Sequence, residues 1–263
     1  MAGEDILVLA AVRSEIQGVL DCITHQSDRM IGGRPVHYGR MGGMPLRLVV
    51  AGPGIFNTVQ AITACVENKK PLLMIQAGCG GGFRQFGMAN GDIAVATAET
   101  DVHLGIETGG HDMPLLELPF PVHESDGMVF KANYPLDLNL AETAFLRLKA
   151  VFEPAGIRVF KGPFVTGSTV TGSDERAAYL FKTFSPCMES MEGAAAAFLS
   201  QYYRLPFLEI RCVSNWVGKR DLSRWDLSLA CRRAGQAAAD LIAFFIKEHH
   251  DHPVISGLFH MSQ

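Results

Sequence analysis

Short apolar runs that alternate with longer helical patterns are the feature that most constrains how this chain can fold. Residues 6–11 (ILVLAA), 46–51 (LRLVVA) and 72–77 (LLMIQA) are almost uninterrupted apolar runs of strand length, and helical patterns follow the first two at 13–23 and 56–67. Continuous apolar runs are typical of strands buried on both faces of a sheet that helices cover. The pattern therefore predicts the α/β class, as a single domain with a central mixed β-sheet flanked by helices.

The rest of the chain continues this alternation with one exception. Further strands are predicted at 92–97, 158–166 and 207–213, and further helices at 138–152, 191–202 and 222–247. The exception is the poorly patterned stretch 103–135, and a loop of that length inside a compact domain usually forms a lid or a binding segment. We therefore expect one domain over residues 1–248, with 103–135 as a lid-like insertion and 249–263 as a C-terminal tail.

Composition and charge exclude several classes of protein. Hydrophobic residues make up 48% of the chain and charged residues 19%, which describes a packed globular protein and not a disordered one. Lys and Arg number 23 against 27 Asp and Glu, and the resulting charge of −4 argues against a nucleic-acid partner. No apolar run approaches the ~18 to 20 residues of a membrane span. The opening MAGEDILVLAAV lacks the basic segment of a signal peptide, so we expect a cytoplasmic protein without a membrane partner.

The cysteines and histidines give no pattern of a metal centre. None of the cysteines has CxxC spacing, so we expect reduced thiols at Cys22, Cys65, Cys79, Cys187, Cys212 and Cys231. The dense histidine tract at 249–252 follows the last predicted helix and is expected to be part of a solvated tail. We predict no metal site and no cofactor.

Polar and glycine residues follow four of the predicted elements at the place where open α/β sheets bind their ligands. They are 13–15 (RSE), 78–82 (GCGGG), 191–193 (MEG) and 214–215 (SN). Because ligands of such sheets lie outside the carboxyl ends of the strands, we expect these four clusters to converge. The GCGGG run has neither the GxGxxG spacing nor the Gly-Lys-Ser/Thr ending of a P-loop. It predicts a tight turn whose backbone a ligand can approach closely.

Longer segments around these clusters resemble the nucleoside phosphorylase-I superfamily, whose members cleave N-ribosidic bonds. SMEGAAAAFLSQYYRLPFLEIRCVSNWVG is similar to the MEGAA…PF…R.ISD or ISN segment of that superfamily, and QAGCGGGF with NGDIAVAT is similar to its TGxAGG…GDIVV block. AAVRSEI resembles the AMxxE segment of its nucleosidase branch, and FVTGSTVTG resembles its base-contacting strand. More narrowly, SNWVGKRDLSRWDLSLA is similar to the pattern of futalosine hydrolases, which remove hypoxanthine from futalosine in the menaquinone pathway.

Cleavage of an N-ribosidic bond needs an anion near the sugar, donors near the departing base and a positioned nucleophile, because the sugar becomes positive and the base negative. Glu15, at the end of the first strand, can act as the general base on water, which is the role that the resemblance implies. The alternative is an ordinary surface glutamate in a first helical turn.

Glu192 begins an alanine-rich helix that must be largely buried, and a buried carboxylate is costly unless it is hydrogen-bonded. A bidentate contact to the ribose 2′- and 3′-hydroxyls would satisfy it. The resemblance implies this arrangement, with Met191 packed beneath the sugar, whereas the alternative is a helix cap.

Asn215 stands where adenine-cleaving members of the superfamily carry an aspartate that protonates N7. An amide cannot supply that proton, but it can donate to O6 and engage N7 of a 6-oxopurine such as hypoxanthine. The alternative is an asparagine that satisfies a strand-to-helix turn. Glu15, Glu192 and Asn215 are thus the predicted catalytic residues. The predicted substrate-binding residues are Gly78, Cys79, Gly80, Phe164, Val170, Thr171, Met191 and Ser214, of which Phe164 has a place in the strand core as its alternative.

The sequence thus predicts a cofactor-free nucleosidase that releases hypoxanthine from futalosine or a related 6-oxopurine nucleoside, with the 103–135 segment facing the 5′ side. The alternatives are a methylthioadenosine-type nucleosidase, a phosphate-dependent phosphorylase and a non-catalytic purine-nucleoside sensor. A phosphorylase needs cations around phosphate; Arg13 is a candidate, but Glu15 would repel the dianion. The resemblance also implies a homodimer or a larger homo-oligomer.

Overall fold

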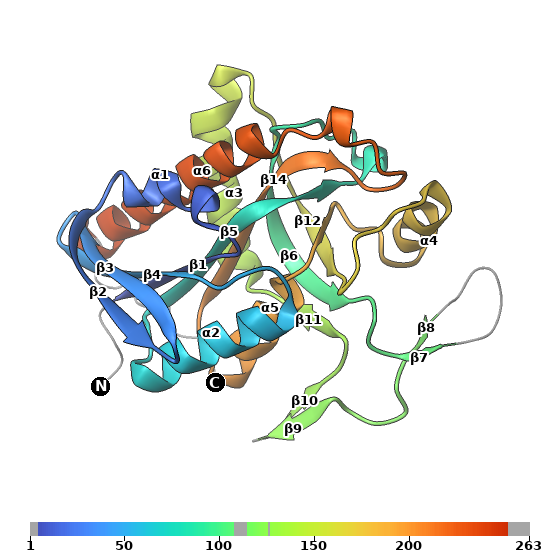
Figure 1. The fold of residues 1–263 in the computed structure, drawn as a ribbon, viewed down its shortest axis with the longest axis horizontal. Coiled ribbons are helices and arrows are strands. Elements are labelled where there is room, and N and C mark those ends of the chain that lie inside the picture. Colours follow the sequence, from blue (N-terminus) through green and yellow to red (C-terminus); the bar gives the residue numbers. More distant parts are fainter. Residues whose placement is uncertain (1–4, 108–114, 126, 252–263) are drawn as a thin grey trace.

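The first strand, β1 (Ile6–Ala10), lies at the centre of the sheet because its side chains are buried on both faces. Val8 packs in a core cluster with residues of the last helix, while Leu7 and Leu9 pack on the opposite face. In this computed structural model, which describes residues 5–107, 115–125 and 127–251, β1 pairs in parallel with β4 (Met44–Val50) and β5 (Leu73–Gly82) (Figure 1).

The other strands extend this central trio in two directions. β2 (Thr24–Ile31) and β3 (Arg34–Met41) continue the sheet antiparallel beyond β4. On the other side the sheet closes on itself, because the strands pair in the sequence β5, β14, β6, β12, β13 and back to β5. The bounds of these strands are Ile93–Asp101 for β6, Val159–Thr166 for β12, Met188–Ser190 for β13 and Phe207–Trp216 for β14. β11 (Asn133–Pro135) is antiparallel to β6 at the outer edge.

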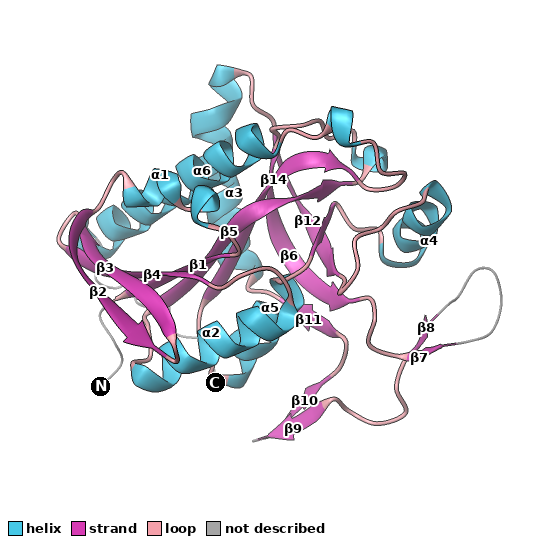
Figure 2. Cartoon of the chain, in the orientation of Figure 1, coloured by secondary structure: helices cyan, strands magenta, loops and turns pink. Residues whose placement is uncertain are grey.

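Helices cover both faces of the sheet (Figures 1 and 2). One face packs against α3 and α6, which are Leu138–Phe152 and Leu227–Asp251, with the short α1 (Gln17–Leu20) beside α6. The other face packs against α2 (Ile55–Asn68) and α5 (Gly193–Tyr202). A sixth helix, α4 (Asp174–Phe184), covers the far end of the closed part of the sheet. The predicted α/β domain with a central mixed sheet flanked by helices is confirmed.

Single-turn 3-10 helices occupy four connections, Arg13–Glu15 (η1), Arg84–Phe86 (η2), Glu153–Ala155 (η3) and Leu222–Arg224 (η4). The helix expected at 13–23 is therefore η1 followed by α1. It ends at Leu20, and β2 begins at Thr24.

The glycine run 78–82 is not the turn that we expect from the sequence, because β5 continues through it to Gly82. Glycine is needed for close packing at Gly80, where a Cβ would lie 2.7 Å from the carbonyl oxygen of Glu189. Ser214 and Asn215 likewise lie inside β14 and do not follow it. β5 and β14 pair with each other, so the glycine run and these polar residues lie side by side within the sheet.

The 103–135 segment contains short strands in its described part, with residues 108–114 and 126 outside the described residues. Within this segment, the strands before β11 are Ile106–Glu107 (β7), Leu115–Leu116 (β8), His123–Ser125 (β9) and Met128–Phe130 (β10).

Towards the C-terminus, α6 runs to Asp251, past the boundary that we place at 248, and 252–263 lie outside the described residues. No helix in the described part combines the length and the apolar character needed to cross a membrane.

Candidate active site

A cavity of about 350 Å³ brings the four predicted clusters together at one edge of the sheet. Each cluster contributes lining residues, so the predicted convergence of these segments is observed. The predicted site residues that line the cavity are Glu15, Cys79, Gly80, Val170, Met191, Glu192, Ser214 and Asn215.

Glu15 is buried, which excludes an ordinary surface glutamate. Its Oε2 accepts hydrogen bonds from the backbone amides of Ala11 at 2.9 Å and Val12 at 3.0 Å. Its Oε1 accepts from the amide of Cys79 at 2.9 Å. Three backbone donors therefore hold the carboxylate in a fixed orientation at the cavity wall.

Glu192 is the N-cap residue of α5, but its side chain does not cap that helix. Instead, Oε1 accepts from the amide of Gly54 at 2.9 Å, and Oε2 accepts from Arg211 Nη1 at 3.0 Å. The free-energy cost of burying this carboxylate is thus offset by its ion pair with the buried Arg211.

Arg211 is the centre of a buried network that the sequence analysis does not predict. It also donates from Nε to Glu209 at 2.8 Å and from Nη1 to the carbonyl of Cys79 at 3.1 Å. Burial lowers the pKa of Arg211, but the negative charges of Glu209, Glu192 and Glu15 outweigh burial and raise it. The guanidinium is therefore permanently charged and fixes the position of Glu192 relative to β5.

Behind Arg211, two carboxyl groups face each other in the core. Burial, followed by the charge and hydrogen bond of Glu209, raises the pKa of Glu99 well above its ordinary value. Thr166 Oγ1 donates to Glu99 Oε2 at 2.8 Å. Gly193 makes room for the pair, because a Cβ there would lie 1.9 Å from Glu99 Oε1 and 2.6 Å from Glu209 Oε2.

Asn215 lines the cavity with its amide oriented by two neighbours. Its Oδ1 lies 2.7 Å from the donating Ser214 hydroxyl, and its Nδ2 donates to the Trp216 carbonyl at 3.1 Å. A primary amide has two N–H groups, so one is engaged with Trp216 and the second is available to a ligand.

The cavity wall also contains an acidic residue that the predicted site lacks. Glu189 lines the cavity, and it accepts from the backbone amide of Thr171 at 3.2 Å and from its hydroxyl. Burial raises the pKa of Glu189, although both hydrogen bonds from Thr171 act against this shift.

Three predicted binding residues do not line the cavity. Phe164 is fully buried in a core cluster, which is the alternative that the sequence leaves open. Thr171 is buried and contacts Glu189, so it supports the wall from behind. Gly78 lies behind two functional groups, because a Cβ there would lie 2.8 Å from Arg211 Nη1 and 2.9 Å from Glu15 Oε1.

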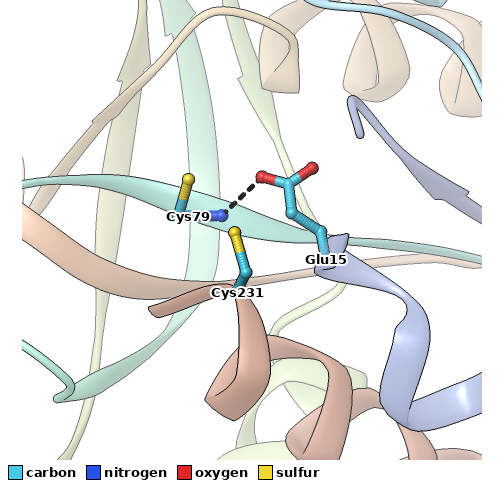
Figure 3. A group of neighbouring side chains, drawn as sticks. All are labelled: Glu15, Cys79 and Cys231. Atoms are coloured by element: carbon cyan, nitrogen blue, oxygen red, sulfur yellow. Dashed lines mark hydrogen bonds between the residues drawn. The ribbon is translucent and has the colours of Figure 1, made fainter. Parts of the chain in front are cut away.

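Two thiols flank Glu15 (Figure 3). Cys79 comes from β5 and Cys231 from α6, and both line the cavity. A hydrogen bond between the thiols raises the pKa of Cys79 and lowers that of Cys231. The cavity is further lined by Ala11, Val12, Ser14, Pro53, Gly81, Ser190, Trp225 and Leu227.

The segment 103–135 contributes none of its described residues to this cavity. Phe130 packs in the core cluster that contains α2 and α5 residues, and His103 accepts at Nδ1 from the amide of Ser168 at 2.8 Å. A role of this segment on the 5′ side of a substrate therefore stays a prediction.

Among the site residues that the sequence does not predict, one pair on β14 is visible in the sequence as charges within an apolar run. Glu209 and Arg211 interrupt the otherwise apolar run FLEIRCV two positions apart, so both side chains lie on the same face of a buried strand. Charges in that position are found only with partners. Trp225 lies in the motif SNWVGKRDLSRWDLSLA, which could have marked it as a site residue, whereas no local signal marks Cys231.

A family model described as the phosphorylase superfamily matches residues 5–247, and the chain therefore belongs to that superfamily. A 5′-methylthioadenosine/S-adenosylhomocysteine nucleosidase from Bacillus thuringiensis (strain Al Hakam) is 27% identical over 245 residues, which are 92% of this chain and 96% of the relative. The membership confirms the resemblance of the sequence motifs.

Two solved structures show the same fold. The 5′-methylthioadenosine/S-adenosylhomocysteine nucleosidase from Neisseria meningitidis, in complex with methylthio-immucillin-A, matches with a TM-score of 0.75 and 23% identity, over 92% of this chain and 100% of that one. The futalosine hydrolase of Helicobacter pylori strain 26695 matches with a TM-score of 0.76 and 20% identity, over 91% and 97%. Both structures share the fold of this chain. The superfamily match together with the nucleosidase relative confirms the predicted enzyme class, an N-glycosyl hydrolase.

Proposed function

We propose that this chain is a nucleosidase that hydrolyses the N-ribosidic bond of futalosine or a closely related 6-oxopurine nucleoside and releases hypoxanthine. The observation that carries the proposal is Glu15, a buried carboxylate held by three backbone amides in a cavity that also exposes Glu192 and Asn215. Such a reaction would serve the menaquinone pathway, as the sequence resemblance implies.

Glu15 is the proposed general base. The three amides fix the direction of its carboxylate, so that a remaining lone pair can take a proton from water as the water attacks the anomeric carbon. Preorganised donors also cost no rearrangement at the moment of reaction.

Glu192 is the proposed ribose-binding residue. Oε1 accepts from the Gly54 amide and retains a lone pair for a ribose hydroxyl, whereas Oε2 accepts from Arg211 and, at 3.3 Å, from the Met191 amide, so a ribose hydroxyl there would replace the longer of these two bonds. Its negative charge would also oppose the positive charge that develops on the sugar, an interaction that grows toward the transition state. Met191, which lines the cavity beside it, would supply the apolar contact beneath the sugar ring.

Asn215 is the proposed reader of the purine 6-position. With one N–H engaged by Trp216, the second can donate to O6 of a leaving hypoxanthine, which would stabilise the charge that the base acquires. Ser214, whose hydroxyl donates to the Asn215 carbonyl oxygen, would hold the amide in that orientation.

The charge of the cavity favours hydrolysis over phosphorolysis. Among the lining residues that the structure describes, Arg211 is the only basic one, and it is engaged by Glu192 and Glu209. Arg13, the candidate phosphate ligand, does not line the cavity and contacts His37. A phosphate dianion would meet carboxylates without a free cation, which is unfavourable at short distance in a partly buried site.

Methylthioadenosine-type activity is the second candidate. The curated relatives favour it, since the Bacillus thuringiensis protein is a nucleosidase for 5′-methylthioadenosine and S-adenosylhomocysteine. Asn215 and the motif that follows it favour the 6-oxopurine.

Incubation with futalosine, inosine and methylthioadenosine, each with and without phosphate, tests the proposal. Hypoxanthine released from futalosine without phosphate is the expected result. Phosphate dependence would indicate a phosphorylase, and preferred release of adenine would indicate the second candidate. Saturable binding without turnover would indicate a sensor.

A further inference from the structure

Three potential metal ligands meet at the wall of the cavity although no sequence motif joins them. Glu15 comes from η1, Cys79 from β5 and Cys231 from α6 (Figure 3). One carboxylate oxygen and the two sulfur atoms all lie within 4.8 Å of one another. The absence of CxxC spacing predicts no metal site, but the fold assembles this group from distant segments.

The donor set suits a thiophilic cation. Zinc bound at about 2.3 Å from each sulfur places tetrahedral ligands about 3.8 Å apart, so a shift of about 1 Å or less would close these three atoms on one ion. Thiolate ligands select zinc and similar soft ions over magnesium or calcium, which prefer oxygen. Three protein ligands leave one coordination position open, and here it would face the cavity.

The group is held in place by its surroundings. The amide of Cys79 itself donates to Glu15, which joins two of the ligands directly, and two further amides fix the other carboxylate oxygen. Cys231 is buried on α6, whose start is capped by Asp226, with Oδ1 accepting from the Leu229 amide at 2.9 Å. Little rearrangement is therefore needed before an ion binds.

We propose that Glu15, Cys79 and Cys231 form a binding site for a thiophilic divalent cation such as Zn²⁺ or Cd²⁺ inside the active-site cavity. Binding displaces water ligands of the hydrated ion and forms two metal–sulfur bonds and one metal–oxygen bond, while two S–H bonds break and release both protons to solvent, with no change of oxidation state.

The consequence for activity rests on the proposed function. A cation on Glu15 would occupy the carboxylate that is to accept the proton of water. Its positive charge would also oppose the positive charge developing on the sugar. Occupancy of the site should therefore inhibit hydrolysis, and a chelator should restore it.

Optical titration of the phosphine-reduced full chain with Cd²⁺ and Co²⁺ tests the site without any activity measurement. We expect a cadmium–thiolate charge-transfer band that saturates at one ion per chain, and the visible absorption of tetrahedral cobalt. Since loss of an outer-sphere partner already costs about 10- to 100-fold in metal affinity, Cys231→Ser and Cys79→Ser should each weaken binding at least about 100-fold. Cys22→Ser removes an exposed thiol outside the group and should leave the titration unchanged.

Glu15→Gln should weaken binding but keep the thiolate band, because both sulfur ligands remain. If Cys79→Ser does not fold, as judged by circular dichroism, Cys231→Ser decides the test alone. Equal cadmium affinity in Cys231→Ser and wild type, or a titration altered by Cys22→Ser, would overturn the proposal. A chain that binds cadmium as expected but cleaves no nucleoside would support the metal site and contradict the proposed function. A chain that cleaves the nucleoside but does not bind cadmium at these residues would contradict the metal site and leave the proposed function standing.

Discussion

At the scale of single residues, the candidate site depends on how each polar group is held. Glu15 is fixed by backbone amides, Glu192 by an amide and a guanidinium, and Asn215 by a hydroxyl and a carbonyl. Backbone partners cannot be replaced by mutation of a neighbouring side chain. The orientation of Glu15 is therefore the most robust of the three, and that of Asn215 depends most on its side-chain neighbour.

Replacing Asn215 with Asp tests which purine the site reads. The aspartate places an acceptor opposite O6, a mismatch of roughly 1 to 3 kcal/mol, so kcat/KM for the 6-oxo substrate should fall about 5- to 150-fold. A 6-amino analogue offers a donor there, and a protonated aspartate can give a proton to N7. The rate with the 6-amino analogue relative to that with the 6-oxo substrate should therefore rise. The ratio of kcat/KM for paired 6-oxo and 6-amino nucleosides is the observable. An unchanged ratio would mean that Asn215 does not read the 6-position.

At the scale of elements, the strand and helix pattern was predictable wherever periodicity was strong. The central strands, α2 and α3 follow their apolar patterns closely, whereas α6 begins at Leu227 and not at the predicted 222, where η4 lies. The β2–β3 hairpin was missed, although Gly32-Gly33 is a recognisable turn signal, with both residues at positive φ. The length of β5 and β14 was also missed, because their last residues are glycine and polar, and strand pairing there depends on contacts between distant segments.

The same limit applies to the site. The four clusters were predictable, because ligand sites lie at strand ends in such folds. Arg211, Glu209 and Glu99 were not predicted, since their partnership is created by packing between β14, β6 and α5. Phe164 could not be assigned to pocket or core from the sequence, because alternate strand residues face opposite sides.

The start of α5 is a packing constraint that a small change should disturb. Gly193→Ala adds a methyl group where Glu99 Oε1 would lie 1.9 Å away, so we expect overpacking to cost roughly 1 to 3 kcal/mol in the free energy of unfolding. Gly172→Ala is the matched control, because a Cβ there meets nothing within 4 Å. Urea denaturation compares the two variants. A Gly193→Ala protein as stable as wild type would show that the carboxyl pair can move aside.

The Glu99–Glu209 pair gives the whole molecule a pH dependence of stability. The folded-state pKa of Glu99 lies above its ordinary value of 4.5, so between the two values the folded protein binds more protons than the unfolded chain. The contribution of Glu99 to the free energy of unfolding is therefore complete below pH 4.5 and is lost as the pH rises through the folded-state pKa. Glu99→Gln keeps a neutral side chain, so its free energy of unfolding should fall less than that of wild type from about pH 5 to 8.

Urea denaturation at a series of pH values measures the free energy of unfolding of both proteins. Parallel curves of this free energy against pH for Glu99→Gln and wild type would contradict the assignment. Glu175→Gln, which neutralises an exposed carboxyl on α4, is the control and should follow wild type.

Large apolar side chains are exposed on the surface of the molecule, and three of them, Val12, Val170 and Leu227, line the cavity. Phe56 is 90% exposed at the start of α2, close in sequence to Pro53 of the cavity wall. Together with the family resemblance, this supports a homodimer or larger oligomer in solution. Light scattering at micromolar concentration should give more than the monomer mass, and Phe56→Asp should shift it toward the monomer. A fully active monomer would contradict this expectation.

The rate of hypoxanthine release from futalosine in phosphate-free buffer, compared between wild type and Glu15→Gln, tests the central claim most directly. The substitution keeps the size of the side chain and removes the base. We predict release by wild type, a fall in kcat of about 10² to 10⁴ in the variant and little change in KM. A Glu15→Gln enzyme with wild-type kcat would contradict the account, because water activation would then belong to another group.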